Sequence, residues 1–228
     1  MAHLAHYREA HPLPFVITHW VNLVCMLLLI LSGLYIHFPF FPGWEGVARG
    51  LHMFCAFVIV INCLTRVVLA FVVKSAPTGG TREKVTDFKT WLPQADNRHQ
   101  LGAWLKYYLF LKKEHPLGAK LGVPQKLTYL AIPPLLILMF FTGMCLWGPT
   151  MHVGPFVLAT DFVGGLMVMR IIHFFMMFFF ICFMLLHVYL ANVEGLSPSK
   201  LMFFRREHGG LTYNPEKHVI DGEDDSVH

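Results

Sequence analysis

The chain has 228 residues, of which 55% are hydrophobic and only 14% are charged, and its formal net charge at pH 7 is +4. A soluble domain usually carries about a quarter charged residues, so this composition, with a mean hydropathy of +0.53, excludes an ordinary soluble domain. The length suits one compact helical bundle, and we expect a single membrane domain over residues 1–228.

Four apolar stretches are long enough to cross a bilayer, which takes about 20 mainly apolar residues. The N-terminal segment lacks the pattern of a cleaved signal peptide, so the first stretch is expected to remain as a span. Each stretch should be helical, because a lipid-exposed backbone must satisfy its own hydrogen bonds. The sequence therefore predicts an all-α membrane protein, a four-transmembrane-helix bundle. The spans cover about residues 15–38, 51–73, 127–147 and 163–191.

The long loop after the second span and the C-terminal tail form the polar parts of the chain. In the loop, Leu101, Trp104, Leu105 and Tyr108 recur at helical spacing with lysines at the edges. This pattern predicts an interfacial helix in the headgroup layer, and a partner-docking helix would show the same pattern. The tail, about residues 205–228, is polar with an acidic end and is expected to be disordered.

The lysines and arginines set the orientation. Of the 18 in the chain, fifteen lie in the N-terminal segment, the long loop and the C-terminal tail. The other two connections hold only Arg49 and Arg170, and Arg66 lies within a span. By the positive-inside rule, both termini and the long loop are expected in the cytoplasm. The chain is then a multi-pass protein of the cytoplasmic membrane of a bacterium or archaeon, with no sign of nucleic-acid binding.

Five cysteines all fall inside apolar segments, and none forms a CxxC or CxxCH motif. This pattern argues against disulfides, zinc ribbons, cysteine-ligated clusters and covalently attached haem. Free cysteine as a small buried hydrophobe is the expected role.

Four of the fourteen histidines lie within the predicted spans: His19, His52, His173 and His187. An imidazole in lipid is costly unless it has a partner, so each is a candidate functional residue. The predicted orientation places His19 and His187 near the cytoplasmic face. It places His52 and His173 near the outer face. Two pairs at two depths are therefore expected.

His173 and His187 are also expected on one face of the last span. Fourteen residues at about 100° each bring the helix within about 40° of whole turns, so both side chains point the same way. The rise between them is about 21 Å. This layout suits two bis-histidine haems b stacked across a bundle, since each iron takes one axial nitrogen from each of two facing helices. Zinc or copper sites need ligands clustered at one depth. A proton relay and chance pairing are the alternatives.

Arg66 and Arg170 are candidate partners of haem propionates. Arg66 follows His52 by fourteen residues, and an arginine within a span requires an anion or reaches the headgroups. Arg170 precedes His173 by three residues and is assigned to the outer haem in the same way. Ser32–Gly33 and Thr142–Gly143 would leave room for a flat macrocycle, or they serve ordinary close helix packing.

Several motifs of the chain resemble the di-haem cytochrome b subunits of membrane-bound nickel-iron hydrogenases, formate dehydrogenases and thiosulfate-reductase-type enzymes. They are THW with LSGLYIHFP, GLHMFCAFVIVINCLTR, PQKLTY with TGMCLWGP, and RIIHFFMMFFFICFMLLHVYLA. The resemblance covers nearly the whole chain. It implies the same four ligands, His19, His52, His173 and His187. It also implies electron transfer between iron–sulfur and catalytic subunits at the outer face and menaquinone or ubiquinone near the cytoplasmic face.

The quinone contact departs from that resemblance. In formate-dehydrogenase-type members an Asn precedes the Gln-Lys pair, and here Gly122 stands at about that place. The candidates for quinone binding are Gln125, Lys126, His19 and Trp20, because an amide or a lysine can hydrogen-bond a quinone carbonyl. Interfacial anchoring is the alternative role for these residues.

Two other functions fit a four-span bundle less well. A self-contained cytochrome b quinone oxidoreductase would need its own substrate site at the outer face, where the connections are short and carry few charges. A transporter or haem-delivery protein is disfavoured because the sequence shows no inverted repeats or broken helices. An electron-transfer subunit without a catalytic core of its own is the reading we prefer.

Overall fold

The computed structural model describes residues 2–6, 8–76, 84–91, 101–112, 123–192, 196–206, 208–214 and 219–223. The chain forms two compact units. The first unit comprises residues 1–18, 65–131 and 191–228, and the second comprises residues 19–64 and 132–190. The three segments that the lysines and arginines assign to the cytoplasm all belong to the first unit.

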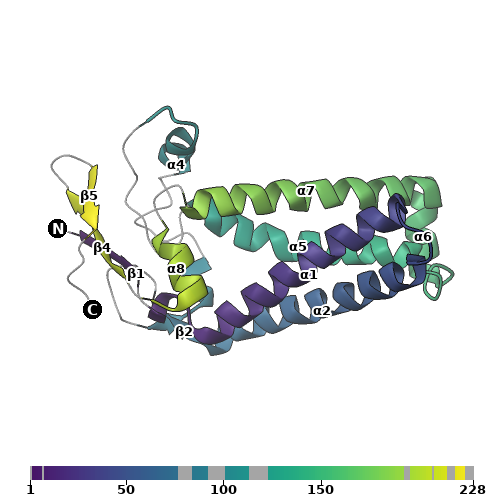
Figure 1. The fold of residues 1–228 in the computed structure, drawn as a ribbon, viewed down its shortest axis with the longest axis horizontal. Coiled ribbons are helices and arrows are strands. Elements are labelled where there is room, and N and C mark those ends of the chain that lie inside the picture. Colours follow the sequence, from purple (N-terminus) through teal and green to yellow (C-terminus); the bar gives the residue numbers. More distant parts are fainter. Residues whose placement is uncertain are drawn as a thin grey trace. The chain divides into compact units, whose positions relative to one another are not determined.

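Four long helices account for the predicted spans: α1 (Leu13–His37), α2 (Glu45–Val72), α5 (Val123–Leu146) and α7 (Leu166–Asn192). The second unit contains most of each of these helices (Figure 1) together with the connection between α1 and α2 and the connection between α5 and α7. α1, α2 and α7 are long and apolar enough to cross a membrane. In α5 the apolar part that the structure describes is shorter, Leu130–Leu146. Three of the four predicted spans are thus matched by long apolar helices.

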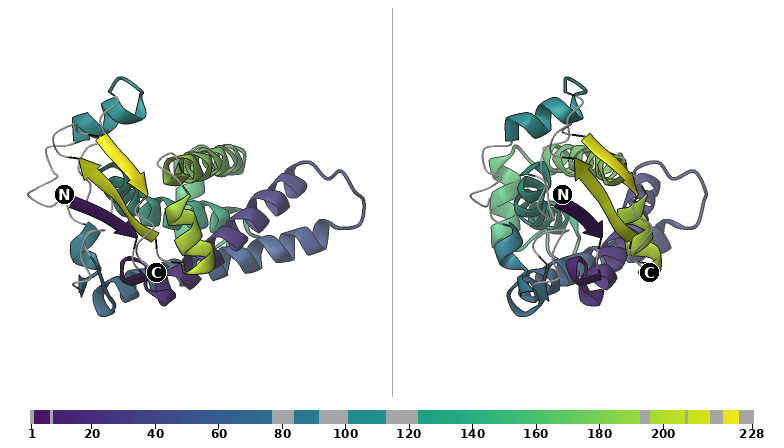
Figure 2. Two further views of the ribbon diagram at one scale, coloured as in Figure 1. Left: turned by 60° about the vertical axis from the view of Figure 1, so that its left-hand side comes forward. Right: turned by 90° about the vertical axis from the view of Figure 1, so that its left-hand side faces the viewer.

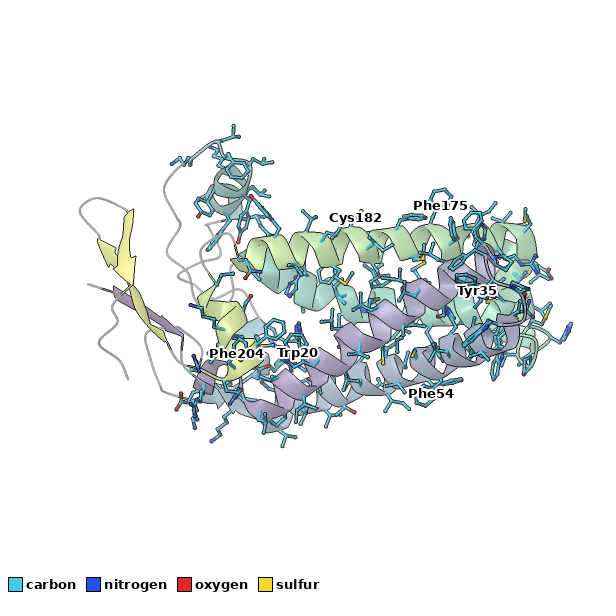
Figure 3. The ribbon with its side chains drawn as sticks, viewed as in Figure 1. Trp20, Tyr35, Phe54, Phe175, Cys182 and Phe204 are labelled. Carbon is cyan, nitrogen blue, oxygen red and sulfur yellow. The ribbon has the colours of Figure 1, made fainter. Side chains whose placement is uncertain are left out.

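One hydrophobic core joins all four helices within the second unit. It consists of buried residues from α1, α2, α5 and α7: Cys25, Cys55, Ile59, Cys63, Leu136 and Phe180. The cysteines are free thiols, and three of them pack in this core as small apolar residues. Phe54, Phe175 and Cys182 instead point away from the neighbouring helices and are exposed (Figure 3). A helix that is apolar on its outer side as well as its inner side belongs in lipid.

The connection between α5 and α7 contains a further helix that the sequence analysis did not predict, α6 (Gly154–Phe162). It ends at two glycines in the left-handed region, Gly164 with φ 100° and Gly165 with φ 105°. Glycine adopts these angles without a steric penalty, so the chain can leave α6 and start α7 directly. The predicted start of the fourth span, residue 163, therefore falls three residues before α7.

The first unit holds short elements. A short 3₁₀ turn, η1 (Arg8–Ala10), precedes α1. β2 (Lys74–Ser75) pairs with β3 (Val85–Thr86), and α3 (Phe88–Trp91) follows directly. Within the segment predicted to form an interfacial helix, α4 (Leu101–Tyr108) confirms the helix, although it is only eight residues long. α8 (Ser197–Phe204) lies before the tail.

The chain is mostly helical, as predicted, but the first unit also contains a three-stranded antiparallel sheet that the all-α prediction lacked. Two of its strands lie in the segment that was expected to be disordered and correct that expectation for residues 208–214 and 219–223. Its strands are β1 (Ala2–His6), β4 (His208–Asn214) and β5 (Val219–Glu223), in the order β1-β4-β5 (Figure 2). None of the three strands has enough apolar residues to form a core alone. They form because two distant pieces of chain complete each other's backbone hydrogen bonds, which composition does not reveal.

Candidate functional site

The four intramembrane histidines all belong to the second unit and meet there as two pairs. The ring centroids of His19 in α1 and His187 in α7 are 6.1 Å apart. Those of His52 in α2 and His173 in α7 are 6.3 Å apart. α7 therefore supplies one imidazole to each pair, and the partners come from two other helices, in the combinations that depth predicted.

These ring separations fit one metal atom between the two imidazoles of each pair. A metal–imidazole bond is about 2.0–2.1 Å, and the ring centre lies about 1.1 Å behind the bonding nitrogen, so two imidazoles on opposite sides of one metal have centroids about 6.3 Å apart. Within the described ranges, no three His, Cys, Asp or Glu side chains gather around one point. A pair of neutral nitrogen donors without a third or fourth ligand suits the two axial positions of a haem iron, whose other four positions are porphyrin nitrogens.

His52 is oriented by a hydroxyl group on the neighbouring helix. Its Nδ1 lies 3.0 Å from the Ser32 Oγ in α1. The Ser32 hydroxyl donates its single hydrogen to the Leu28 carbonyl, 2.6 Å away. With that hydrogen on Leu28, the Ser32 oxygen accepts from the imidazole, and we therefore assign the proton to Nδ1. Nε2 is left as the bare nitrogen, which is the form that ligates a metal.

His173 is oriented in the same way by a hydroxyl in α5. Its Nδ1 lies 2.8 Å from the Thr142 Oγ1, which donates to the Met139 carbonyl at 2.8 Å. Here too the hydroxyl oxygen accepts from Nδ1–H, and Nε2 stays free of a proton. His52 and His173, the pair predicted to be the outer one, are thus both oriented by a hydroxyl group and are assigned the same tautomer.

A glycine follows each of these hydroxyl residues and lies against the same imidazole. A Cβ atom added to Gly33 would meet the Cε1 of His52 at 3.2 Å, and one added to Gly143 would meet the Cε1 of His173 at 3.2 Å. The sequence analysis assigned the room at these glycines to a macrocycle or to ordinary helix packing. The structure shows that the room is taken by the histidine rings themselves.

Replacing Gly143 with alanine is expected to push the His173 ring by a few tenths of an ångström and to destabilise the fold by about 1–3 kcal/mol, as overpacking usually does. A ring whose Nδ1 is hydrogen-bonded cannot move away freely, so we expect a changed absorption spectrum of any haem held by His52 and His173. Gly46→Ala is the control, because nothing lies within 4 Å of its added Cβ and alanine favours a helix. Equal spectra for Gly143→Ala and the unmodified protein would contradict this prediction.

The inner pair has aromatic surroundings. Trp20 meets the His19 ring edge-on with centroids 5.4 Å apart, and Phe183 stacks on the His187 ring at 5.8 Å. Figure 3 shows Trp20 near the start of α1. Three residues after His19 in α1, the Asn22 Oδ1 accepts a hydrogen bond of 2.6 Å from the Asn62 Nδ2 of α2. This amide pair was not predicted from the sequence, although two asparagines in apolar spans are a visible signal.

The structure gives Arg66 an anionic partner other than the predicted one. In the first unit, its Nη2 lies 2.7 Å from the Oδ2 of Asp87, whose side chain is fully buried. The guanidinium also lies 3.9 Å from the centre of the Phe15 ring, a cation–π distance. Asp87 therefore balances the charge of Arg66 in this structure, and a contact of Arg66 with a haem propionate stays a prediction. Asp87 lies in the long loop, and no sequence pattern connected it to α2.

The remaining candidates are placed by the structure without being brought together. Gln125 and Lys126 lie in the first turns of α5, and their side chains are outside the described part of the chain. The Arg170 side chain is exposed in the first turns of α7. Their roles at a quinone and at a propionate stay predictions.

Comparison with known proteins gives one result. The family model described as prokaryotic cytochrome b561 matches residues 10–204 of the chain. That range contains the four long helices and both histidine pairs, and it ends before β4. No curated protein matches the chain.

Proposed function

Because the chain belongs to the prokaryotic cytochrome b561 family, an integral-membrane group of electron-transfer proteins that bind b haems, we propose that it carries electrons across the bilayer through two of them. His19 and His187 would hold the inner haem, and His52 and His173 the outer one. A bound haem supplies an iron that takes up and releases one electron. The protein's part is to hold, orient and separate the two haems.

The observation that carries this proposal is the distance between the ring centroids of each histidine pair, 6.1 Å and 6.3 Å. α7 supplies one histidine to each pair, and α1 and α2 supply the others. Fourteen residues of α7 separate its two histidines, a rise of about 21 Å. Electrons would therefore move most of the way across a hydrocarbon core of about 30 Å within one chain. Three of the four rings, those of His19, His52 and His173, are partly buried, and the His187 side chain is exposed.

The terminal strands support four crossings. β1 pairs with β4, with Leu4 opposite Leu211, so the two ends of the bundle lie on the same side of the membrane. Three crossings cannot return the chain to its starting side, and α5, with 24 residues and a rise of about 36 Å, supplies the fourth. The first unit carries sixteen of the 18 lysines and arginines, which favours the cytoplasm for that unit. The inner pair is then the one nearer the cytoplasm.

The partners follow from the family resemblance and the proposed orientation. An iron–sulfur subunit with its catalytic subunit would dock at the outer face and exchange electrons with the haem on His52 and His173. Menaquinone or ubiquinone would bind near the inner haem, with Gln125, Lys126, His19 and Trp20 as candidate contacts. The edge-on contact of Trp20 with His19 supports an aromatic wall at that place.

The test is the haem content and the electron route of the purified chain. A pyridine haemochrome assay is expected to give two haems b per chain, and a redox titration to resolve two one-electron steps. In proteoliposomes, a reduced quinone analogue should reduce both haems. Zero or one haem per chain would overturn the proposal, whereas two haems without quinone reactivity would overturn only the quinone part of it.

A further inference from the structure

We propose that Ser32 and Thr142 are positioning residues that set the reduction potential of the outer haem, and that they lower it. The inference rests on the proposed function, because it assumes that His52 and His173 ligate one iron. It adds a task for two hydroxyl groups that do not touch the haem iron and act through the ligands.

The first step is the direction of each hydrogen bond. The hydroxyl hydrogens go to backbone carbonyls of their own helices, from Ser32 at 2.6 Å and from Thr142 at 2.8 Å. The oxygens face the imidazole Nδ1 atoms at 3.0 Å and 2.8 Å. A hydroxyl that donates one hydrogen bond becomes a better acceptor for the next, because hydrogen bonds in a chain polarise one another. Each imidazole therefore donates to a strengthened acceptor in a low-dielectric interior.

The second step is the effect on the metal bond. An Nδ1–H that donates to an oxygen leaves more electron density on Nε2, which raises the basicity of the ligand. A more basic ligand stabilises the ferric iron more than the ferrous iron, because the ferric state carries the higher charge. Because His52 and His173 would hold the same haem, the two hydrogen bonds would change its potential in the same direction. The outer haem is then harder to reduce than it would be without the hydroxyls.

The third step is the restriction of this arrangement to one haem. The same two-residue pattern occurs twice: Ser32–Gly33 in α1 faces His52 of α2, and Thr142–Gly143 in α5 faces His173 of α7. In each case the hydroxyl binds Nδ1 and the glycine admits the ring. Among the residues that the structure describes, His19 and His187 have no hydroxyl on a ring nitrogen. Within the described part of the chain, the hydroxyl contacts therefore act on the outer haem, and a lower outer potential favours electron flow from the outer haem to the inner one.

The experiment is a redox titration of the purified chain with each haem followed by its own absorption or electron-paramagnetic-resonance signal. In Ser32→Ala and Thr142→Val, we expect the Fe(III)/Fe(II) ratio of the outer haem at a fixed potential to fall by about threefold to tenfold, the tenfold limit being 59 mV for one electron. The inner haem is the internal reference and should not change. Ser32→Thr and Thr142→Ser keep the hydroxyls and should restore the original potential.

Thr150→Val is the matched control, because the Thr150 Oγ1 donates to the Met144 carbonyl at 2.6 Å and the loss of this hydroxyl leaves both imidazoles untouched. Unchanged outer potentials in Ser32→Ala and Thr142→Val with two haems retained would overturn the inference and leave the proposed function standing. Equal shifts of both haems would also overturn it. If Ser32→Ala fails to bind haem, Ser32→Cys, a weaker acceptor of similar size, should show a smaller shift in the same direction.

Discussion

Replacing His187 with alanine is expected to lower the haem content from two to one per chain and to reduce quinone-linked electron transfer by at least about a hundredfold. Removing a residue that is hydrogen-bonded to a metal ligand already lowers metal affinity or activity about 10- to 100-fold. Removing the ligand itself is expected to lower them further. His19, whose ring centroid lies 6.1 Å from that of His187, would be the one histidine left to hold the inner haem, and one ligand would not suffice. The outer haem should remain, because the variant leaves His52, His173 and their hydroxyl partners unchanged.

The measurements are the pyridine haemochrome assay, the redox titration and quinol-driven haem reduction in proteoliposomes. His37→Ala is the matched control. His37 lies in α1, as His19 does, but its ring stacks on that of Phe174, with centroids 4.3 Å apart, and not on a second histidine. We expect two haems in the control. Loss of both haems in His187→Ala, or loss of one in His37→Ala, would mean that the assignment of the inner pair is wrong.

Replacing Asp87 with alanine is expected to destabilise the chain by about 3–5 kcal/mol, because it removes one member of a buried ion pair and leaves the Arg66 charge behind. The carboxylate accepts hydrogen bonds from Arg66 at 2.7 Å, from Ser75 at 2.6 Å and from the Trp91 indole at 3.0 Å. Its own carbonyl accepts from the Thr90 hydroxyl at 2.7 Å. One residue thus ties the end of α2 to β2 and α3, and all of these contacts fall within the first unit.

The measurement is the midpoint of thermal unfolding in detergent. A matched control is Asp161→Ala, whose exposed carboxylate in α6 should change stability by less than about 0.5 kcal/mol. The double variant Arg66→Met with Asp87→Ala should lose less than the sum of the two single losses, since neither charge is then left alone. Additive losses would show that Arg66 and Asp87 contribute independently and not as a pair.

The histidine pairs could be predicted from the sequence because two simple quantities fix them. Hydropathy sets where each span begins, and the rise of a helix converts residue number into depth, so His19 and His187 fall at one level. The helical period places His173 and His187 on one face of α7. The four long helices follow from the same hydropathy. Hydropathy, helical rise and helical period are local to each span, so they can be obtained from a single sequence.

The partners of Arg66, His52 and His173 could not be predicted in the same way. Arg66 needs an anion, but its partner Asp87 lies 21 residues further along the chain. The two short strands between them, β2 and β3, are too short to show a periodic pattern in the sequence. Ser32 and Thr142 were visible as small polar residues, yet their direction toward Nδ1 depends on the rotation of one helix against the next. That rotation comes from the packing of the core and not from composition.

The pairing of β1 with β4 constrains the order in which parts of this protein can fold. Residues 2–6 are synthesised before residues 208–214, so β1 has no partner strand β4 while the four long helices are being inserted. An unpaired strand is a template for any other exposed strand, including that of a neighbouring nascent chain. Pairing of β1 with β4 can therefore be completed only after the four long helices between them have been synthesised.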